Sequence, residues 1–120
     1  MNQICVPLSP VDAIERLAIL TLRYDSAIVA TERARLRGEL TTLGRAIDRI
    51  LPDSADPKKA FYEVHADLWS LQDDLRACVA RGDFGPAFLA LAQSHIAVLD
   101  QAEALRRTLA DELDKGGSIQ

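Results

Sequence analysis

The sequence predicts an all-α protein, an antiparallel bundle of four helices in one domain that spans residues 1–120. Apolar residues recur in steps of three and four along three long segments, which are separated by turns rich in Pro or Gly. Leu and Ala are abundant and only 5% of the chain is aromatic, which favours helices over strands. We therefore expect helices over 10–24, 27–51, 58–80 and 86–114, with an extended leader over 1–8 and a flexible tail over 115–120.

The first helix has a clear start signal. Ser9 can cap the helix, Pro10 suits its first position, and Asp12 places a negative charge at the positive end of the helix dipole. The apolar residues that follow cover more than half of the helix circumference: Ile14, Leu17, Ile19, Leu20 and Leu22. This segment must therefore be buried on several sides.

The length of the first helical segment leaves two architectures open. No Pro or Gly follows Pro10 until Gly38, and the apolar pattern continues to Leu51. One straight helix would be about 63 Å long, and its most apolar part would then need a second subunit to cover it. The alternative is a break near Asp25 and Ser26, both good capping residues. We favour the break, which gives four helices, over three helices whose very long first helix dimerises.

The third predicted helix has three distinct faces. Its core face is formed by Phe61, Val64, Leu68, Leu71, Leu75 and Cys78. A mixed shoulder, where recognition or chemistry could occur, carries Tyr62, His65, Trp69, Gln72 and Arg76. A solvated face carries Glu63, Asp67, Ser70 and Asp74. After the turn over 82–86, the last helix has an apolar seam of Phe88, Leu91, His95, Val98, Ala102, Leu105 and Leu109.

The net charge and the cysteine content argue against several kinds of partner and site. A net charge of −4 argues against nucleic acid as a partner, because phosphate binding needs a basic surface. The arginines over 33–37 are flanked by Glu32 and Glu39, which indicates a solvated helix face. Cys5 and Cys78 are too few and too far apart for a disulfide framework or a zinc site. With no secretory signal and no membrane span in the sequence, we expect a cytoplasmic protein that does not enter membranes.

The best candidate site is a polar layer across the predicted bundle. Matching levels through the turns places Arg16, Asp73 and His95 close together, and Arg76 can pair with Asp73 on its own helix. We favour a structural ion-pair layer that fixes helix register, and the alternative is a pocket for an anionic ligand or a metal. The full set of ligand-binding candidates is Arg16, Arg23, His65, Trp69, Asp73, Arg76, His95 and Asp100. The sequence carries no signature of a metal site, a cofactor site or a catalytic group.

Several segments resemble a small bacterial family, the domain of unknown function numbered 6165. The matching segments are VPLSP (6–10), IERLAILTLR (14–23), LWSLQDDLR (68–76), GDFG (82–85) and FLALAQS (88–94). Residues that match include Arg16, Arg23, Asp73, Arg76 and Asp100. The family favours Asn, an acid and Asn where this chain has His65, Gln72 and Leu99. The resemblance implies a short cytoplasmic helical protein without an established reaction, with a weak link to cell-surface polysaccharide genes.

Two functional hypotheses from different classes follow. The first is a non-enzymatic helical module that self-associates as a homodimer or binds a protein partner, because the first helix is too apolar for a small monomer to cover. The second is a ligand-binding or enzymatic bundle that uses Asp73, Arg76 and Arg16, with Trp69 and His65 at the mouth of the site. We favour the first, since no catalytic signature is present.

Overall fold

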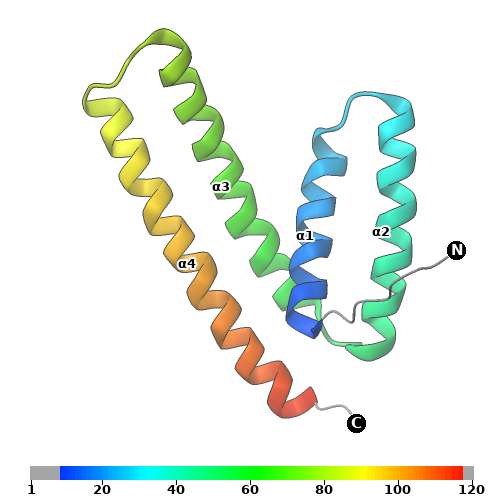
Figure 1. Ribbon diagram of the computed structural model, residues 1–120. Coiled ribbons are helices and arrows are strands. Elements are labelled where there is room, and N and C mark those ends of the chain that lie inside the picture. Colours follow the sequence, from blue (N-terminus) through cyan, green and yellow to red (C-terminus); the bar gives the residue numbers. More distant parts are fainter. Residues whose placement is uncertain (1–8, 118–120) are drawn as a thin grey trace, which may run out of the picture.

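The computed structural model describes residues 9–117 and confirms the all-α fold with four helices. The helices are α1 (Pro10–Ser26), α2 (Ala30–Ile50), α3 (Ala55–Arg81) and α4 (Pro86–Gly117), and no strand occurs in the described residues. Figure 1 shows that consecutive helices run in opposite directions, as predicted. The break in the first helical segment is thereby confirmed. The predicted leader, including Cys5, lies outside the described residues.

The four helices form two hairpins, α1–α2 and α3–α4, and α1 lies between α2 and α3 (Figure 1). The backbone of α1 packs against all three other helices, whereas that of α2 comes close only to α1. Figure 1 shows the loop between α3 and α4 lying far from the α1–α2 hairpin. The radius of gyration is 17.0 Å, against about 13.6 Å expected for a compact domain of this length. The arrangement is therefore open, and the far half of the α3–α4 hairpin lacks cover from α1 and α2.

The start of α1 and its end are both fixed by side chains. The backbone N–H of Asp12 donates to Oγ of Ser9 over 3.1 Å, which confirms the predicted cap. At the other end, Nη1 of Arg33 donates to the carbonyls of Tyr24 and Ala27 over 2.8 and 3.1 Å. The same guanidinium lies 4.1 Å from the centre of the Tyr24 ring. Arg33 thus satisfies carbonyls at the end of α1 and holds the turn into α2.

Three predicted helix boundaries each differ from the structure by three residues. The second helix starts at Ala30 instead of residue 27, after a short loop over 27–29. The third helix starts at Ala55 instead of residue 58, because Pro57 falls within the first turn, where a missing N–H removes no hydrogen bond. The last helix runs to Gly117 instead of ending at residue 114. Glycine lowers helix propensity but keeps its N–H, so it does not end a helix as proline does.

Gly82 ends α3 in the left-handed conformation that glycine favours, with φ of 68°. Its N–H donates to the carbonyl of Val79 over 3.0 Å, and the N–H of Asp83 donates to that of Cys78 over 2.9 Å. Cys78 itself is buried and unpaired, as predicted. These bonds satisfy carbonyls of the last turn of α3 and reverse the chain toward α4.

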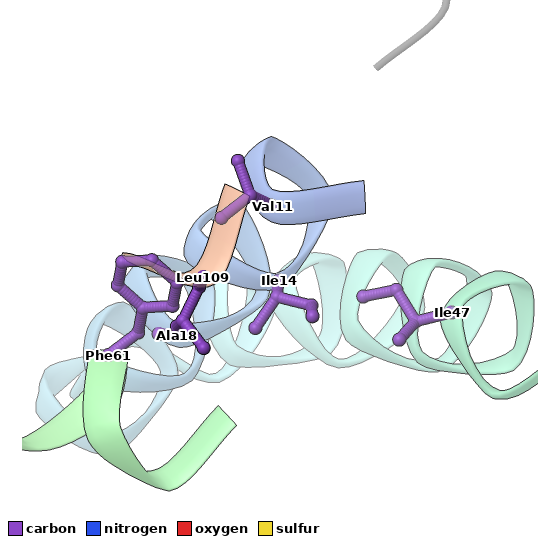
Figure 2. Close-up of a cluster of buried hydrophobic side chains, with 6 residues drawn as sticks. All are labelled: Val11, Ile14, Ala18, Ile47, Phe61 and Leu109. Carbon is purple, nitrogen blue, oxygen red and sulfur yellow. The ribbon is translucent and has the colours of Figure 1, made fainter. Parts of the chain in front are cut away.

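The main hydrophobic cluster lies where the four helices meet. Its buried members are Val11, Ile14, Ala18, Ile47, Phe61 and Leu109, which Figure 2 shows as side chains from all four helices. The predicted core face of α3 is buried or half-buried at every position. Leu20 and Leu22 of α1 are also buried within the chain. The expectation that α1 needs a second subunit to cover it was therefore wrong, because its neighbours in the same chain cover it.

Candidate functional site

The predicted polar layer does not form inside the bundle. Nη1 of Arg76 lies 3.5 Å from Oδ1 of Asp73, so the predicted pair exists, but both side chains are 76% exposed. Arg16 lines a cleft beside α2, whereas Arg76 and His95 line a groove between α3 and α4. We predicted the layer by assuming that residues at the same height along neighbouring antiparallel helices lie side by side. The layer does not form because the two hairpins diverge.

A polar network that we did not predict from the sequence joins α1, α3 and α4. Nε2 of His65 lies 2.9 Å from Oε2 of Glu15, and because an ionised carboxylate only accepts, the ring N–H donates. Arg106 of α4 bonds the other oxygen of Glu15 and also reaches Oδ1 of Asp12 over 2.9 Å. The side chains of Glu15 and His65 are only 13% and 16% exposed. This network ties α1 to both helices of the other hairpin.

The shoulder of α3 makes two further contacts with neighbouring helices. The hydroxyl of Tyr62 donates to Oδ2 of Asp25 over 2.7 Å, and this hydrogen bond raises the pKa of Tyr62 above its ordinary value. The amide of Gln72 lies 3.3 Å from Nε2 of His95, which is half-buried in the α3–α4 interface. Trp69 is half-buried at the same shoulder. Apart from the exposed Arg76, the shoulder therefore serves as an interface within the chain.

The far half of the α3–α4 hairpin carries an uncovered apolar surface. An open groove of about 510 Å³ runs between the two helices, lined by Leu75, Arg76, Val79, Ala80, Phe88, Ala92, His95 and Ile96. Val79 is 54% exposed and Ile96 is 59% exposed. Leu89 and Leu99 of α4 are exposed as well. We call the surface formed by Val79, Leu89, Ile96 and Leu99 together with this groove the hairpin face.

The hairpin face can also be recognised in the sequence, as an apolar stripe of α4 that lies beside the predicted seam. Leu89, Ala92, Ile96 and Leu99 follow each other at steps of three and four, so α4 has a second apolar stripe beside its seam. Every residue of the predicted seam is buried or half-buried against the rest of the chain. A helix with two apolar stripes must be covered on two sides, and residues 9–117 cover only one.

A charged cleft lies between α1 and α2, and Arg106 of α4 also lines it. It has a volume of about 500 Å³ and is lined by Asp12, Glu15, Arg16, Ile19, Leu20, Arg23, Arg35, Glu39 and Arg106. Of the predicted site residues, it unites only Arg16 and Arg23. Asp100 lies exposed on α4. The charge triplet over 33–37 is partly solvated as predicted, with exposed Arg35 paired to Glu32 and Glu39.

The described residues show neither a metal cluster nor a membrane segment. Among the side chains described, those of residues 9–113, no three His, Cys, Asp or Glu are grouped to hold a metal ion. The helices over residues 9–117 do not combine the length and hydropathy that a bilayer-spanning segment requires. Two surfaces remain as candidate sites: the apolar groove between α3 and α4, and the arginine-lined cleft between α1 and α2.

Comparison with known proteins adds no relative. No family model matches the chain, and neither a curated protein nor a solved structure is found to be similar to it. The resemblance to the family of unknown function therefore stays a prediction.

Proposed function

We propose that this protein is a non-enzymatic helical interaction module that self-associates as a symmetric dimer through the hairpin face. The carrying observation is the second apolar stripe of α4, which together with Val79 of α3 borders an open groove whose surface is almost entirely apolar. A contiguous exposed apolar surface on a soluble chain is typical of an interaction site. The module would act in a reducing compartment such as the cytoplasm, in keeping with the buried free thiol of Cys78.

A second copy of the chain is the occupant that fits this surface best. Two helical hairpins that pack face to face complete a four-helix arrangement, in which each apolar stripe is covered by the stripes of the other copy. The interface is then self-complementary and closes with two-fold symmetry, so the hairpin face is fully used and does not recruit further copies. The large radius of gyration supports this, because the far half of the hairpin projects beyond α1 in a single copy.

Sedimentation equilibrium of the full chain tests the proposal. We expect the wild type to form a dimer at micromolar concentration, twice the chain mass of 13.2 kDa. Ile96→Asp should shift the protein to monomer, because it buries two charges in a symmetric interface. Ile28→Asp is the matched control: Ile28 is 92% exposed in the α1–α2 loop, away from the hairpin face, and its substitution should leave the dimer intact. A wild-type protein that is monomeric at micromolar concentration would overturn the proposal.

A further inference from the structure

The cleft between α1 and α2 holds two arginines without partners in the described part of the chain. Arg16 and Arg23 are exposed, and neither lies within 4 Å of a side-chain carboxylate among residues 9–113. They are seven residues apart on one face of α1, which separates their backbones by about 10 Å. Side chains as long as arginine can converge on one small anion from that separation. Both line the same cleft.

Each carboxylate that lines the cleft is already paired with an arginine other than Arg16 and Arg23, and the lining carries four arginines against three carboxylates. Glu39 accepts from Nη1 of Arg35 over 3.0 Å, and Glu32 accepts from Nε of the same guanidinium over 2.8 Å. Asp12 and Glu15 are bound by Arg106, as described above. These pairs hold Arg35 in place and raise its pKa, chiefly through the hydrogen bond to Glu32. Like any guanidinium in a protein, that of Arg35 is charged. Because Arg35 has five N–H donors, it keeps unused donors that can face the cleft.

The cleft continues into an apolar groove with a glycine in its wall. This extension of about 580 Å³ is lined by Arg16, Leu20, Arg35, Gly38, Glu39, Thr42, Leu43 and Ala46. A glycine inside a helix costs about 0.5–1 kcal/mol relative to alanine. Packing does not demand it at Gly38, since an added Cβ would meet no atom within 4 Å. The glycine therefore leaves open space beside the arginines, with Leu20 as an apolar floor.

We propose that this cleft binds a phosphate group attached to an apolar body. Arg16, Arg23 and Arg35 would surround the phosphate, since guanidinium groups match its oxygens with paired, charge-assisted hydrogen bonds. The apolar body lies along Leu20 in the space beside Gly38. The site is on the opposite hairpin from the hairpin face, so it does not depend on self-association.

Calorimetric titration of the full chain with three soluble probes tests the site. Phenyl phosphate carries both features, inorganic phosphate only the anion, and phenol only the apolar body. We expect phenyl phosphate to bind most tightly, inorganic phosphate more weakly and phenol not at all. Arg16→Gln and Arg23→Gln should each weaken phenyl phosphate binding about tenfold, the effect of one charge-assisted hydrogen bond. Arg45→Gln, an exposed arginine of α2 outside the cleft lining, should leave binding unchanged.

Substitutions at two glycines of α2 distinguish loss of binding from loss of folding. Gly38→Leu fills the groove but raises helix propensity, so it should abolish phenyl phosphate binding while the melting temperature rises or stays level. Gly44→Leu makes the same change in the same helix at a position that also has free space but lies outside the groove lining, and it should keep binding. Loss of binding in both variants, or in neither, would contradict the proposal.

A vesicle arm distinguishes a soluble ligand from a lipid headgroup. Vesicles with phosphatidic acid present the same phosphate chemistry, and vesicles of phosphatidylcholine alone serve as the control. Binding to phosphatidic acid that is lost in Arg16→Gln supports the site with a lipid source, whereas binding of phenyl phosphate alone supports a soluble source. Failure of every phosphate probe to bind at millimolar concentration overturns the inference.

Discussion

Replacing Glu15 by glutamine should destabilise the fold, because this carboxylate connects α1 to α3 and α4. It accepts hydrogen bonds from His65 and Arg106 while its side chain is only 13% exposed. Glutamine keeps the shape of the side chain but removes the charge, and its single amide oxygen cannot serve both partners as the two carboxylate oxygens do.

The size of the effect follows from the exposure of the two partners. A hydrogen bond to a charged group contributes about 1.5–3 kcal/mol to stability. The bond to Arg106 must be discounted, since that side chain is 47% exposed and keeps Asp12 as a partner. Counting mainly the buried bond to His65, we expect Glu15→Gln to cost about 1.5 kcal/mol. For a domain of this length that corresponds to a fall in melting temperature of about 6 °C.

Urea unfolding followed by circular dichroism at neutral pH and fixed protein concentration measures this cost. Asp73→Asn is the matched control, because its pair with Arg76 is 76% exposed on both sides and should contribute less than about 0.5 kcal/mol. An Asp73→Asn variant as destabilised as Glu15→Gln would refute the reasoning, and so would a Glu15→Gln variant as stable as the wild type.

Three further outcomes follow from the same structure. Phe61→Ala should lower the free energy of unfolding by about 3–5 kcal/mol, because Phe61 is fully buried in the cluster where the four helices meet; an unchanged urea midpoint would contradict this. Gly82→Ala should cost about 1–2 kcal/mol by forcing a Cβ into the left-handed conformation, although no atom obstructs it, and thermal unfolding measures the cost. The hydrogen bond to Asp25 raises the pKa of Tyr62, so its stabilisation is complete below the unfolded value of about 10 and is lost as pH rises through the folded value. Tyr62→Phe should remove that alkaline loss from a pH series of urea midpoints, and an identical pH profile would contradict the assignment.

The fold was largely accessible from sequence because its signals are local. Spacing of apolar residues predicted the core face of α3, and the caps at Ser9 and Gly82 follow from short patterns. The break after Ser26 was predicted from side chains that could cap, whereas the structure holds it with Arg33, which lies several residues further on. The position of a helix break can thus be predicted from the residues next to it, even where the residue that stabilises the break lies further along the chain.

The site residues were harder to predict because they depend on how the helices are placed. Asp73 and Arg76 were expected inside the bundle, but the divergence of the two hairpins leaves them in water. Glu15 is one charge among several on α1, and only the rotation of that helix directs it toward His65. The stripe of Leu89, Ile96 and Leu99, by contrast, is visible in the sequence when its spacing is considered separately from the seam.

The most direct test of self-association through the hairpin face is a dilution series followed by amide nuclear magnetic resonance. As the dimer dissociates, amide chemical shifts should change mainly over residues 75–80 and 88–99, which carry the groove and the second stripe of α4. Amide chemical shifts of α1 and α2 should stay constant, because these helices lie outside the hairpin face. Concentration-dependent shifts confined to residues 10–50, or spectra independent of concentration at monomer mass, would contradict the account.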